Sequence, residues 1–557
     1  MINIIKETFF ILNSGPRNIF SMSALFFIGA IIEVLSIILL VKYLALLVDF
    51  SDDHLIVQFV RNYFLYIEQK DIIFYTGILL ILIFALKAVI TFLIQKSILR
   101  YSFNSTSSLI NRLFDSYVIN GKSDSLVLSV AIQNITSHVF TFINQGLISI
   151  LKIFSELFFL VFIATVLLSQ SFYLASLVVG GLISFFILFN YSIAPLIRKY
   201  SLEVNDSQQN IIATVQDTML GLDEVTVYNL SKDYQDKLQS FTRKYKDGML
   251  KFNVLDTLPR IGYEFIIVFF IIFYILNTIS SSDNTLNILE PIVMFAIVAI
   301  RLIPTISQIS THINNIKFSS IARSHLISEV RKKQNKSSNR INIEILDGFK
   351  TKINSIELKN LTFSYTDDLS VLSGINATFS LGEIIGVKGP SGSGKSTLAK
   401  IILGLIEPKN GLMQLNGDNI TNSNELRNNV SYVPQYPYIF NSTIKDNICL
   451  NLPVDDNKLS NIIKISNLNF VEDRLDDKIN NELSTLSGGQ IQRIGIARAL
   501  YSSRDVMIFD EPSSALDKKA EEMIKESLLK IKKDKIIIVI SHSDNLLSIC
   551  DKEIELE

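Results

Sequence analysis

Hydrophobic positions along the chain follow two different patterns. Up to about residue 315 they form long apolar runs, whereas after about residue 340 they form short strand-like and helical patterns. Because a bilayer core of ~30 Å needs roughly 20 apolar residues in a helix, runs of that length predict membrane spans. The predicted spans are Ile19–Val48, Ile72–Ile94, Phe140–Leu168, Phe172–Leu196, Ile261–Ile279 and Ile288–Ile309.

The segments that connect these runs differ in charge. Asp49–Asp71 holds five acidic residues against Arg61 and Lys70, and Ser280–Glu290 has no lysine or arginine. The longer segments after the second and fourth spans carry several lysines and arginines instead. This asymmetry disfavours the alternative that the runs are buried helices of a large soluble protein. Since positive charge remains on the cytoplasmic side and an even number of spans returns the chain to its starting side, we expect both termini to be cytoplasmic, in a plasma (inner) membrane.

The same pattern predicts how the chain divides into domains. Residues 1–325 are expected to form an all-α membrane domain of six transmembrane helices, with cytoplasmic extensions near residues 101–137 and 198–255. Residues 326–353, which include the polar stretch RKKQNKSSNR, are expected to form a linker. Residues 354–557 are expected to form an α/β domain.

Composition narrows the protein class further. The 557 residues are 48% hydrophobic, more than in an ordinary soluble protein. The formal net charge of −1 gives no indication of nucleic-acid binding. The two cysteines, Cys449 and Cys550, exclude an extensive disulfide framework and fit a reducing cytosol.

A strand, a glycine loop and a helix are predicted around "EIIGVKGPSGSGKSTLAKIIL", which contains the pattern G-x-x-x-x-G-K-[ST]. Backbone N–H groups of such a loop wrap phosphates, its lysine bridges the β- and γ-phosphates, and its hydroxyl binds Mg²⁺. The alternative to a phosphate-binding loop is a glycine-rich surface turn without a ligand. The predicted nucleotide-binding residues are Gly389, Pro390, Ser391, Gly392, Ser393, Gly394, Lys395, Ser396 and Thr397, with Ser396 also on the metal.

The stretch "DVMIFDEPSSALD" supplies a second apolar strand that ends in two carboxylates. Asp510 is suited to the water shell of a bound Mg²⁺, and Glu511 is suited to deprotonate an attacking water as a general base. Taken alone, the same two carboxylates could be the solvated end of an ordinary strand. Behind a phosphate loop, the pair predicts nucleotide hydrolysis.

The stretch "LSGGQIQRIGIARAL" is a second glycine loop that opens a helix, which is an anion-binding arrangement. Together with the two motifs above, in this order, it resembles the ATP-binding cassette of ABC transporters over roughly Ile356–Cys550. The resemblance implies an α/β P-loop NTPase fold, with ATP and Mg²⁺ as cofactors. Six spans before one cassette resemble the exporter-type half-transporters.

The resemblance also implies roles for single residues. Tyr365 would stack on adenine, Gln435 would lie near Mg²⁺ and sense the membrane domain, and His542 would hold the γ-phosphate. Asp517 would contact the opposite monomer. As bland alternatives, Tyr365 would be an ordinary strand residue and His542 a packed core residue.

The second glycine loop in this family closes on ATP that is held by another cassette. This chain has one phosphate loop and one "LSGGQ", so we expect a homodimer of two copies. The residues expected to contact the partner's nucleotide are Ser487, Gly488, Gly489 and Gln490.

The membrane half also carries ionisable residues that are expected to be buried, each of which costs at least ~2.5–3.5 kcal/mol at mid-bilayer unless it is paired or lies in a wet cavity. Arg260 and Glu264 are four residues apart and are expected either to pair or to bind substrate. Arg301 has no partner nearby in sequence, so an anionic substrate is an open possibility for it. Lys87 is expected either to face an anionic substrate or to pair with a buried glutamate.

The stretches "LPRIGYE", "AIRLIPT" and the Ser155–Glu156 pair resemble their counterparts in PglK-type flippases, which move lipid-linked oligosaccharides. The resemblance implies that Arg260 and Arg301 meet an anionic pyrophosphate head group while the lipid tail remains in the membrane. We therefore expect an ATP-driven exporter or flippase for an amphipathic, lipid-linked or lipid-like anionic substrate. Export of peptides or drugs is the alternative within transport. A non-transport ABC ATPase and a membrane sensor or channel are the alternatives outside it.

Overall fold

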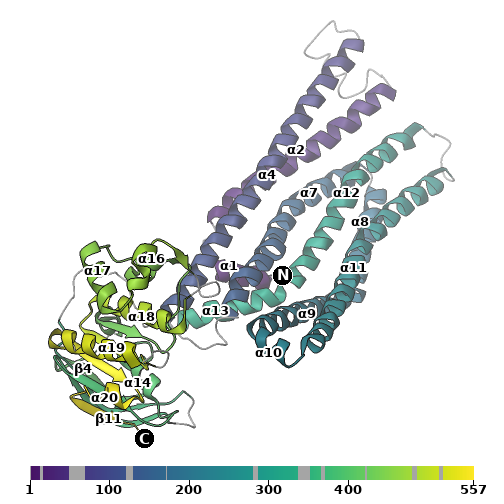
Figure 1. The fold of residues 1–557 in the computed structure, drawn as a ribbon. Helices are drawn as coiled ribbons and strands as arrows, with labels where there is room; N and C mark the ends of the chain where they lie inside the picture. Colours follow the sequence, from purple (N-terminus) through teal and green to yellow (C-terminus); the bar gives the residue numbers. More distant parts are fainter. Residues whose placement is uncertain are drawn as a thin grey trace. The chain divides into compact units, whose positions relative to one another are not determined.

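The computed structural model describes residues 2–12, 17–48, 69–120, 130–170, 172–279, 286–336, 352–365, 370–420, 423–479, 486–513 and 518–556. The chain divides into two compact units, residues 1–338 and 339–557. The first unit is helical and the second contains all the described strands (Figure 1). Each unit is described by itself below.

The described helices of the first unit cover every predicted span. They include two π-helical segments, Asn134–His138 and Phe142–Leu147, directly before α7. The α-helices are α1 (Ile2–Leu12), α2 (Arg17–Val48), α4 (Gln69–Asn120), α6 (Val139–Thr141), α7 (Ile148–Gln170), α8 (Phe172–Ser192), α9 (Ala194–Leu220), α10 (Leu222–Val227), α11 (Ser231–Ile279), α12 (Leu286–Phe318) and α13 (Ser320–Lys336).

Length and hydropathy identify four helical segments in the described part of the chain as able to cross a membrane. They are Ser21–Leu44, Lys70–Tyr117, Val130–Ser169 and Phe295–Phe318. Helix α8 contributes the shorter apolar segment Val178–Phe189. The remaining predicted span, Ile261–Ile279, is the last part of α11, which is 49 residues long. The spans therefore continue into polar helical extensions without a break, as in α4, which has 52 residues.

Two large apolar cores, with smaller ones beside them, hold the first unit together. One joins Val34 of α2, Phe159 of α7, Tyr263 of α11 and Phe295 of α12. The other joins α1, α4, the π-helical segments and α13. Many apolar side chains of α4 remain exposed within a single chain, as expected for a helix that faces lipid or another subunit.

The predicted linker begins later than the polar composition indicates. Helix α13 runs to Lys336, so the first eleven residues of the predicted linker 326–353 are helical. Ala322, Leu326 and Val330 are buried, and their spacing of four residues places them on one helix face. This narrow apolar stripe docks α13 onto the first unit although most of its residues are polar. Residues 337–351 lie outside the described residues.

The second unit is built on a parallel five-stranded sheet in the order β11-β3-β10-β9-β6. An antiparallel sheet in the order β2-β1-β4-β5 and a two-stranded sheet of β7 and β8 accompany it. The strands are β1 (Ser355–Phe363), β2 (Leu372–Ser380), β3 (Ile384–Lys388), β4 (Asn410–Leu415), β5 (Asp418–Asn419), β6 (Val430–Val433), β7 (Ser442–Thr443), β8 (Lys478–Ile479), β9 (Val506–Asp510), β10 (Ile536–Ile540) and β11 (Lys552–Glu555).

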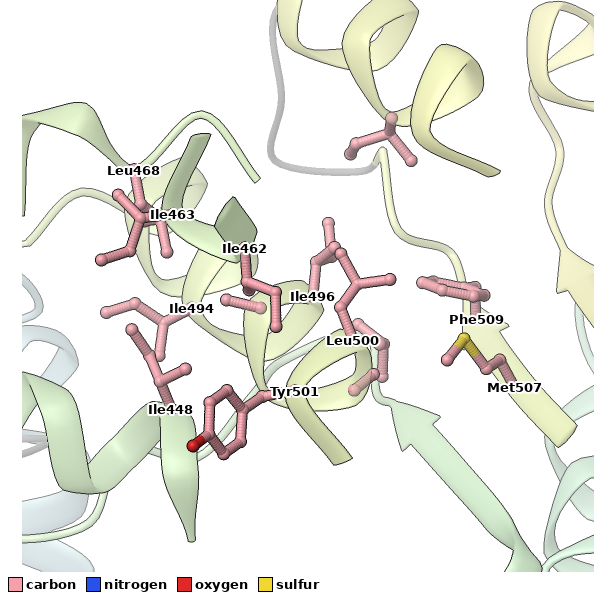
Figure 2. Packing of buried hydrophobic residues seen from close by; sticks show 14 of the residues in the cluster. Ile448, Ile462, Ile463, Leu468, Ile494, Ile496, Leu500, Tyr501, Met507 and Phe509 are labelled. Carbon is pink, nitrogen blue, oxygen red and sulfur yellow. The ribbon is translucent and has the colours of Figure 1, made fainter. Parts of the chain in front are cut away.

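Helices cover the parallel sheet, and alternate strand residues face opposite cores. Met507 and Phe509 lie on one side of β9, against Ile496 and Leu500 of α18, as Figure 2 shows. Val506 and Ile508 lie in the core on the other side. The helices are α14 (Lys395–Ile402), α15 (Ser423–Asn429), α16 (Ile444–Cys449), α17 (Asp456–Ile465), α18 (Gly488–Ser502), α19 (Lys518–Ile531) and α20 (Asp544–Leu547).

The register of the parallel sheet brings several strand ends to one edge. Ile540 of β10 pairs with Asp510 of β9 on one side and with Val387 of β3 on the other. Val433 of β6 pairs with Phe509 of β9. The loops that follow these four strands therefore start close together, at the carboxyl edge where open α/β sheets bind ligands.

Candidate nucleotide site and the charged cluster of the membrane domain

The loop after β3 has the backbone that its glycines permit. Gly392 and Gly394 adopt φ of 88° and 89°, which side-chain-bearing residues rarely adopt. A Cβ at Gly389 would lie 2.4 Å from the carbonyl oxygen of Leu556. A side chain would therefore strain the backbone at Gly392 and would also clash at Gly389 and Gly394.

The loop closes around its own lysine. The Lys395 ammonium is buried and donates hydrogen bonds to the carbonyl oxygens of Gly389, at 2.7 Å, and Pro390, at 2.9 Å. The hydroxyl of Ser393 is buried without a hydrogen-bond partner among the described residues. A buried cation, an orphaned hydroxyl and a helix N-terminus at α14 fit a bound phosphate.

Asp510, the last residue of β9, is held in a buried polar setting. The Tyr432 hydroxyl donates to its carboxylate at 3.1 Å. Burial raises the pKa of Asp510 above its usual range, while the hydrogen bonds from Tyr432 and Ser396 and the charge of Lys395 act to lower it. The structure thus brings Ser396 and Asp510, two of the predicted metal ligands, into contact. Sequence reasoning missed Tyr432, whose only signal was its place on the strand before Gln435.

Glu511 follows Asp510 in a left-handed backbone conformation, with φ of 47°. Its N–H donates to the carbonyl oxygen of Ile540 at 2.8 Å, which anchors the turn to β10. One carboxylate oxygen accepts from the Gln435 amide at 2.7 Å, and the other lies 3.7 Å from Nε2 of His542. Three residues predicted from separate stretches, Gln435, Glu511 and His542, therefore meet at the ends of β6, β9 and β10.

Tyr365 lies beyond the phosphate loop. Its hydroxyl is 3.3 Å from that of Thr397, and its ring meets Phe363 edge-on at 4.9 Å between centroids. Tyr365 is 56% exposed, so a ligand can reach it from solvent.

Ser487 and Gln490 cap the N-terminus of α18. The Ser487 hydroxyl accepts from the Gln490 N–H at 3.3 Å, and the Gln490 side chain accepts from the Ser487 N–H at 2.8 Å. This capping box aligns the first turn, where Gly488 and Gly489 lie. Within the described residues, no hydrogen bond ties this turn to the phosphate loop of the same chain. Asp517 lies outside the described residues.

The ionisable residues of the membrane domain form a closed cluster. Arg301 of α12 contacts both carboxylate oxygens of Glu33 in α2, at 2.6 and 3.2 Å, and lies 3.5 Å from Glu156 of α7. Lys87 of α4 lies 3.3 Å from the same Glu33. The Arg301 guanidinium also lies 5.2 Å from the ring centre of Phe159. We refer to Glu33, Lys87, Glu156 and Arg301 as the charge cluster.

The charge cluster changes two sequence-based expectations. Arg301, which has no partner nearby in sequence, is paired with two glutamates from distant helices, and Lys87 takes the paired alternative. The expected pairing of Arg260 with Glu264 is not formed: both side chains are exposed on α11, and no described contact joins them. Of the predicted substrate residues, Arg260 alone lies outside the charge cluster.

Comparison with known proteins agrees with both units. Residues 372–514 match the family model for the ABC transporter. A solved structure of a bacterial Atm1-family ABC exporter with ATP bound superposes with a TM-score of 0.75 over 97% of this chain and 94% of that chain, at 19% identity. The fold is therefore that of an ABC exporter, with a helical membrane domain followed by a cassette.

Relatives by sequence are export and permease proteins. A probable ABC transporter ATP-binding/permease protein of Haemophilus influenzae is 37% identical over 214 residues, 37% of this chain and 38% of that protein. The microcin-J25 export ATP-binding/permease protein McjD of Escherichia coli is 30% identical over 383 residues, 66% of this chain and 63% of that protein. For five of the curated relatives, the chain spans only 34–38% of their length.

Proposed function

Because this chain has the fold of an ABC exporter and carries an ABC-transporter ATPase domain, we propose that it is an ATP-driven exporter or flippase. The observation that carries the proposal is the convergence of six side chains at adjacent strand ends. These are Lys395, Ser396, Gln435, Asp510, Glu511 and His542.

The proposed nucleotide is ATP with Mg²⁺, which supplies neutralising charge to the phosphates when bound. Ser396, Asp510 and Gln435 hold the metal, and the loop from Gly389 to Thr397 binds the phosphates. Glu511 accepts a proton from the attacking water at its carboxylate, held in place by Gln435 at 2.7 Å. His542 contacts the γ-phosphate, and the exposed Tyr365 stacks on adenine.

The proposed working form is a homodimer. Ser487, Gly488 and Gly489 present N–H and hydroxyl donors to nucleotide held by the second copy, and Asp517 contacts that copy. Gln490 acts through the capping box, because its side chain accepts from Ser487. ATP contacts that exist only in the closed dimer favour closure, which is a population shift.

The proposed location is the plasma (inner) membrane, with both termini and the cassette in the cytoplasm. Support comes from the acidic segment Asp49–Asp71 on the opposite side of the spans from the basic extensions. The four helical segments that meet the length and hydropathy of a span are consistent with this insertion.

For the substrate, we propose an amphipathic, lipid-linked saccharide or other lipid-like anion. Arg260 is exposed on α11 and belongs to no described ion pair, so it is available to an anionic head group. Arg301 and Lys87 would reach such a group only by exchanging Glu33 or Glu156 for it. Arg260 is therefore the stronger of the three proposed contacts.

Peptide export is the second candidate, because McjD, named for microcin-J25 export, aligns with 66% of this chain. The two candidates differ in what stimulates the ATPase. Full-length protein reconstituted in vesicles is assayed with lipid-linked sugars, with lipids and with peptides. Stimulation by peptides alone would contradict the lipid-linked assignment, and stimulation by lipid-linked sugars that is lost in R260A would support it.

The exporter proposal itself is tested with a loop deletion. Removing Ser487–Gln490 from the full-length protein is expected to abolish ATP turnover, because each site needs the partner's loop. Full turnover by a lone, deleted subunit would contradict the dimer and the mechanism together. A separate assay measures the movement of a lipid-linked sugar across the vesicle bilayer. If R301A moves this lipid at the wild-type rate and has normal ATPase activity, Arg301 does not contact the substrate.

A further inference from the structure

A groove of about 550 Å³ lies between α9 and α11, and none of the charge-cluster residues lines it. The two helices run side by side (Figure 1). Such a volume is within the usual range for small-molecule sites. The groove is lined by Lys199, Tyr200, Glu203, Asp206, Ser207, Asn210, Phe241, Lys244 and Lys251.

Close packing of the two backbones creates the groove. A Cβ at Gly248 of α11 would lie 2.9 Å from the side chain of Val204 in α9, so the glycine allows a close approach there. Val204 is fully buried in the core between the helices. On α9, Lys199, Glu203 and Asp206 are three or four residues apart and share one face. Long polar side chains therefore line the groove beside a tight apolar contact.

The charges along the groove are ordered. Lys251 of α11 lies with its ammonium 5.2 Å from the ring centre of Tyr200 in α9, which places it level with the neighbouring Lys199. Glu203 and Asp206 follow one and two helical turns further along α9. One end of the groove thus presents two ammonium groups, the next turn presents Glu203, and the turn after it presents Asp206 level with Lys244 of α11.

These charges are not paired with each other. No described ion pair involves Lys199, Glu203, Asp206, Lys244 or Lys251. By contrast, Lys246 on the same α11 pairs with Asp247 at 3.3 Å. A groove that gathers both signs of charge without joining them has donors and acceptors available to a ligand with both charges.

The two-lysine end lies next to the proposed membrane boundary. Lys199 is three residues beyond Leu196, the end of a predicted span, and Lys251 is ten residues before Ile261, the start of another. At a rise of 1.5 Å per residue, Lys199 is roughly 5 Å from the hydrocarbon core. The contact of Lys251 with Tyr200 places Lys251 at the same level. Head groups occupy the first ~5–8 Å beyond that core. Leu196 is itself 42% exposed and offers an apolar surface beside the groove.

We propose that this groove binds the head group of a phosphatidylethanolamine-type lipid: a phosphate diester with an ammonium group two carbons away. The phosphate lies between Lys199 and Lys251, and the ammonium lies one turn further out, against Glu203. The acyl chains remain at the membrane beside Leu196. The inference rests on the proposed membrane insertion and not on the identity of the transported substrate.

The test measures lipid bound to the full-length protein by native mass spectrometry. The protein is placed in mixed micelles that contain phosphatidylethanolamine, phosphatidylglycerol or phosphatidylcholine at equal mole fraction. K199A/K251A is expected to lower retention of phosphatidylethanolamine on the order of tenfold, as for the loss of two charge-assisted hydrogen bonds at a half-open site. The matched control K237A/K246A also removes two positive charges, from positions of α11 outside the groove, and is expected to bind like the wild type.

A second variant separates the two charges of the head group. E203Q keeps the size of the side chain and is expected to weaken phosphatidylethanolamine binding while leaving phosphatidylglycerol binding unchanged, because only the first lipid carries an ammonium. Equal retention by K199A/K251A and K237A/K246A would overturn the proposal. If soluble phosphoethanolamine binds the groove as tightly as phosphatidylethanolamine does, the acyl chains contribute nothing. That result would overturn the proposal that the ligand is a membrane lipid. None of these outcomes depends on ATP turnover, so they are distinct from a failure of the exporter proposal.

Discussion

The nucleotide site and the charge cluster both gather ionisable side chains from distant parts of the chain, but they use them in opposite ways. In the cassette, the groups stand on loops at the ends of parallel strands, and the buried Ser393 hydroxyl has no described partner. In the membrane domain, two cations and two carboxylates stand on four helices and contact one another. The first arrangement leaves polar groups available to a ligand, whereas in the second the cations and the carboxylates neutralise one another.

The difference follows from the two surroundings. A strand end in water can carry ionisable side chains at little cost, so Glu511 and His542 remain partly exposed. A charge in the bilayer must find an opposite charge or a wet cavity. An arginine in the membrane domain is therefore weak support for substrate binding until its partners are known, while a carboxylate beside a phosphate loop is strong support for chemistry.

Removing the proposed base should have the largest effect in the cassette. E511Q keeps the hydrogen bond to Gln435 possible but cannot accept a proton, so ATP turnover should fall about 10²- to 10⁴-fold. Steady-state ATPase of the reconstituted full-length protein measures it. E553Q, which removes an exposed carboxylate paired with Lys388, is the control. Turnover of E511Q within a factor of two of that control would contradict the assignment.

Breaking the charge cluster should have the largest effect in the membrane domain. E33A leaves Lys87 and Arg301 without their shared carboxylate, and removal of one partner from a buried pair costs about 3–5 kcal/mol in the free energy of unfolding. Denaturation of the detergent-solubilised protein measures the loss. D236A removes an exposed carboxylate from the polar extension of α11 and should change stability by less than ~0.5 kcal/mol.

The pairing itself is measurable by a double-mutant cycle of E33Q and R301Q. A coupling of roughly 0.5–3 kcal/mol is expected for residues in contact. Additive effects would show that the two side chains do not depend on each other, and the comparison between the self-contained cluster and the open nucleotide site would fail.

Loss of the cap at α18 should have a smaller, local effect. S487A removes the hydroxyl that accepts from the Gln490 N–H, which costs about 1 kcal/mol for an N-cap. Hydrogen exchange of the full-length protein should then accelerate in the first turn of α18 and not elsewhere. S502A, at the other end of the same helix, should leave that turn unchanged. Equal exchange in both variants would contradict the capping role.

The smallest expected effect concerns the pH dependence of the nucleotide site. Burial raises the pKa of Asp510, and the Tyr432 hydroxyl favours the carboxylate form by donating to it. Y432F should therefore raise that pKa further, so ATPase activity should be lost at a higher pH on acidification. A hydrogen bond of about 0.5–1.5 kcal/mol limits the shift to roughly one pH unit. Y436F, whose ring is 79% exposed, should leave the profile in place.

The nucleotide-site residues were predictable because each belongs to a short motif. The loop around Lys395 and the pair Asp510–Glu511 each follow a strand within a few residues, so local pattern and chemistry identify them together. Tyr432 escaped because its contact with Asp510 joins residues 78 positions apart on neighbouring strands. The start of the linker was misplaced because three buried residues of α13 stand among many polar ones.

Sequence alone determined the division into an apolar helical half and a cassette. An apolar run specifies one helix and a glycine motif specifies one loop, so both can be recognised from neighbouring residues. Only the tertiary structure decided which charges meet. Glu33 and Arg301 are 268 residues apart, and their pairing depends on how α2 and α12 pack. The same holds for the strand order β11-β3-β10-β9-β6. Which distant strands or helices become neighbours depends on how the whole unit buries its apolar surface, so no short stretch of sequence reveals it.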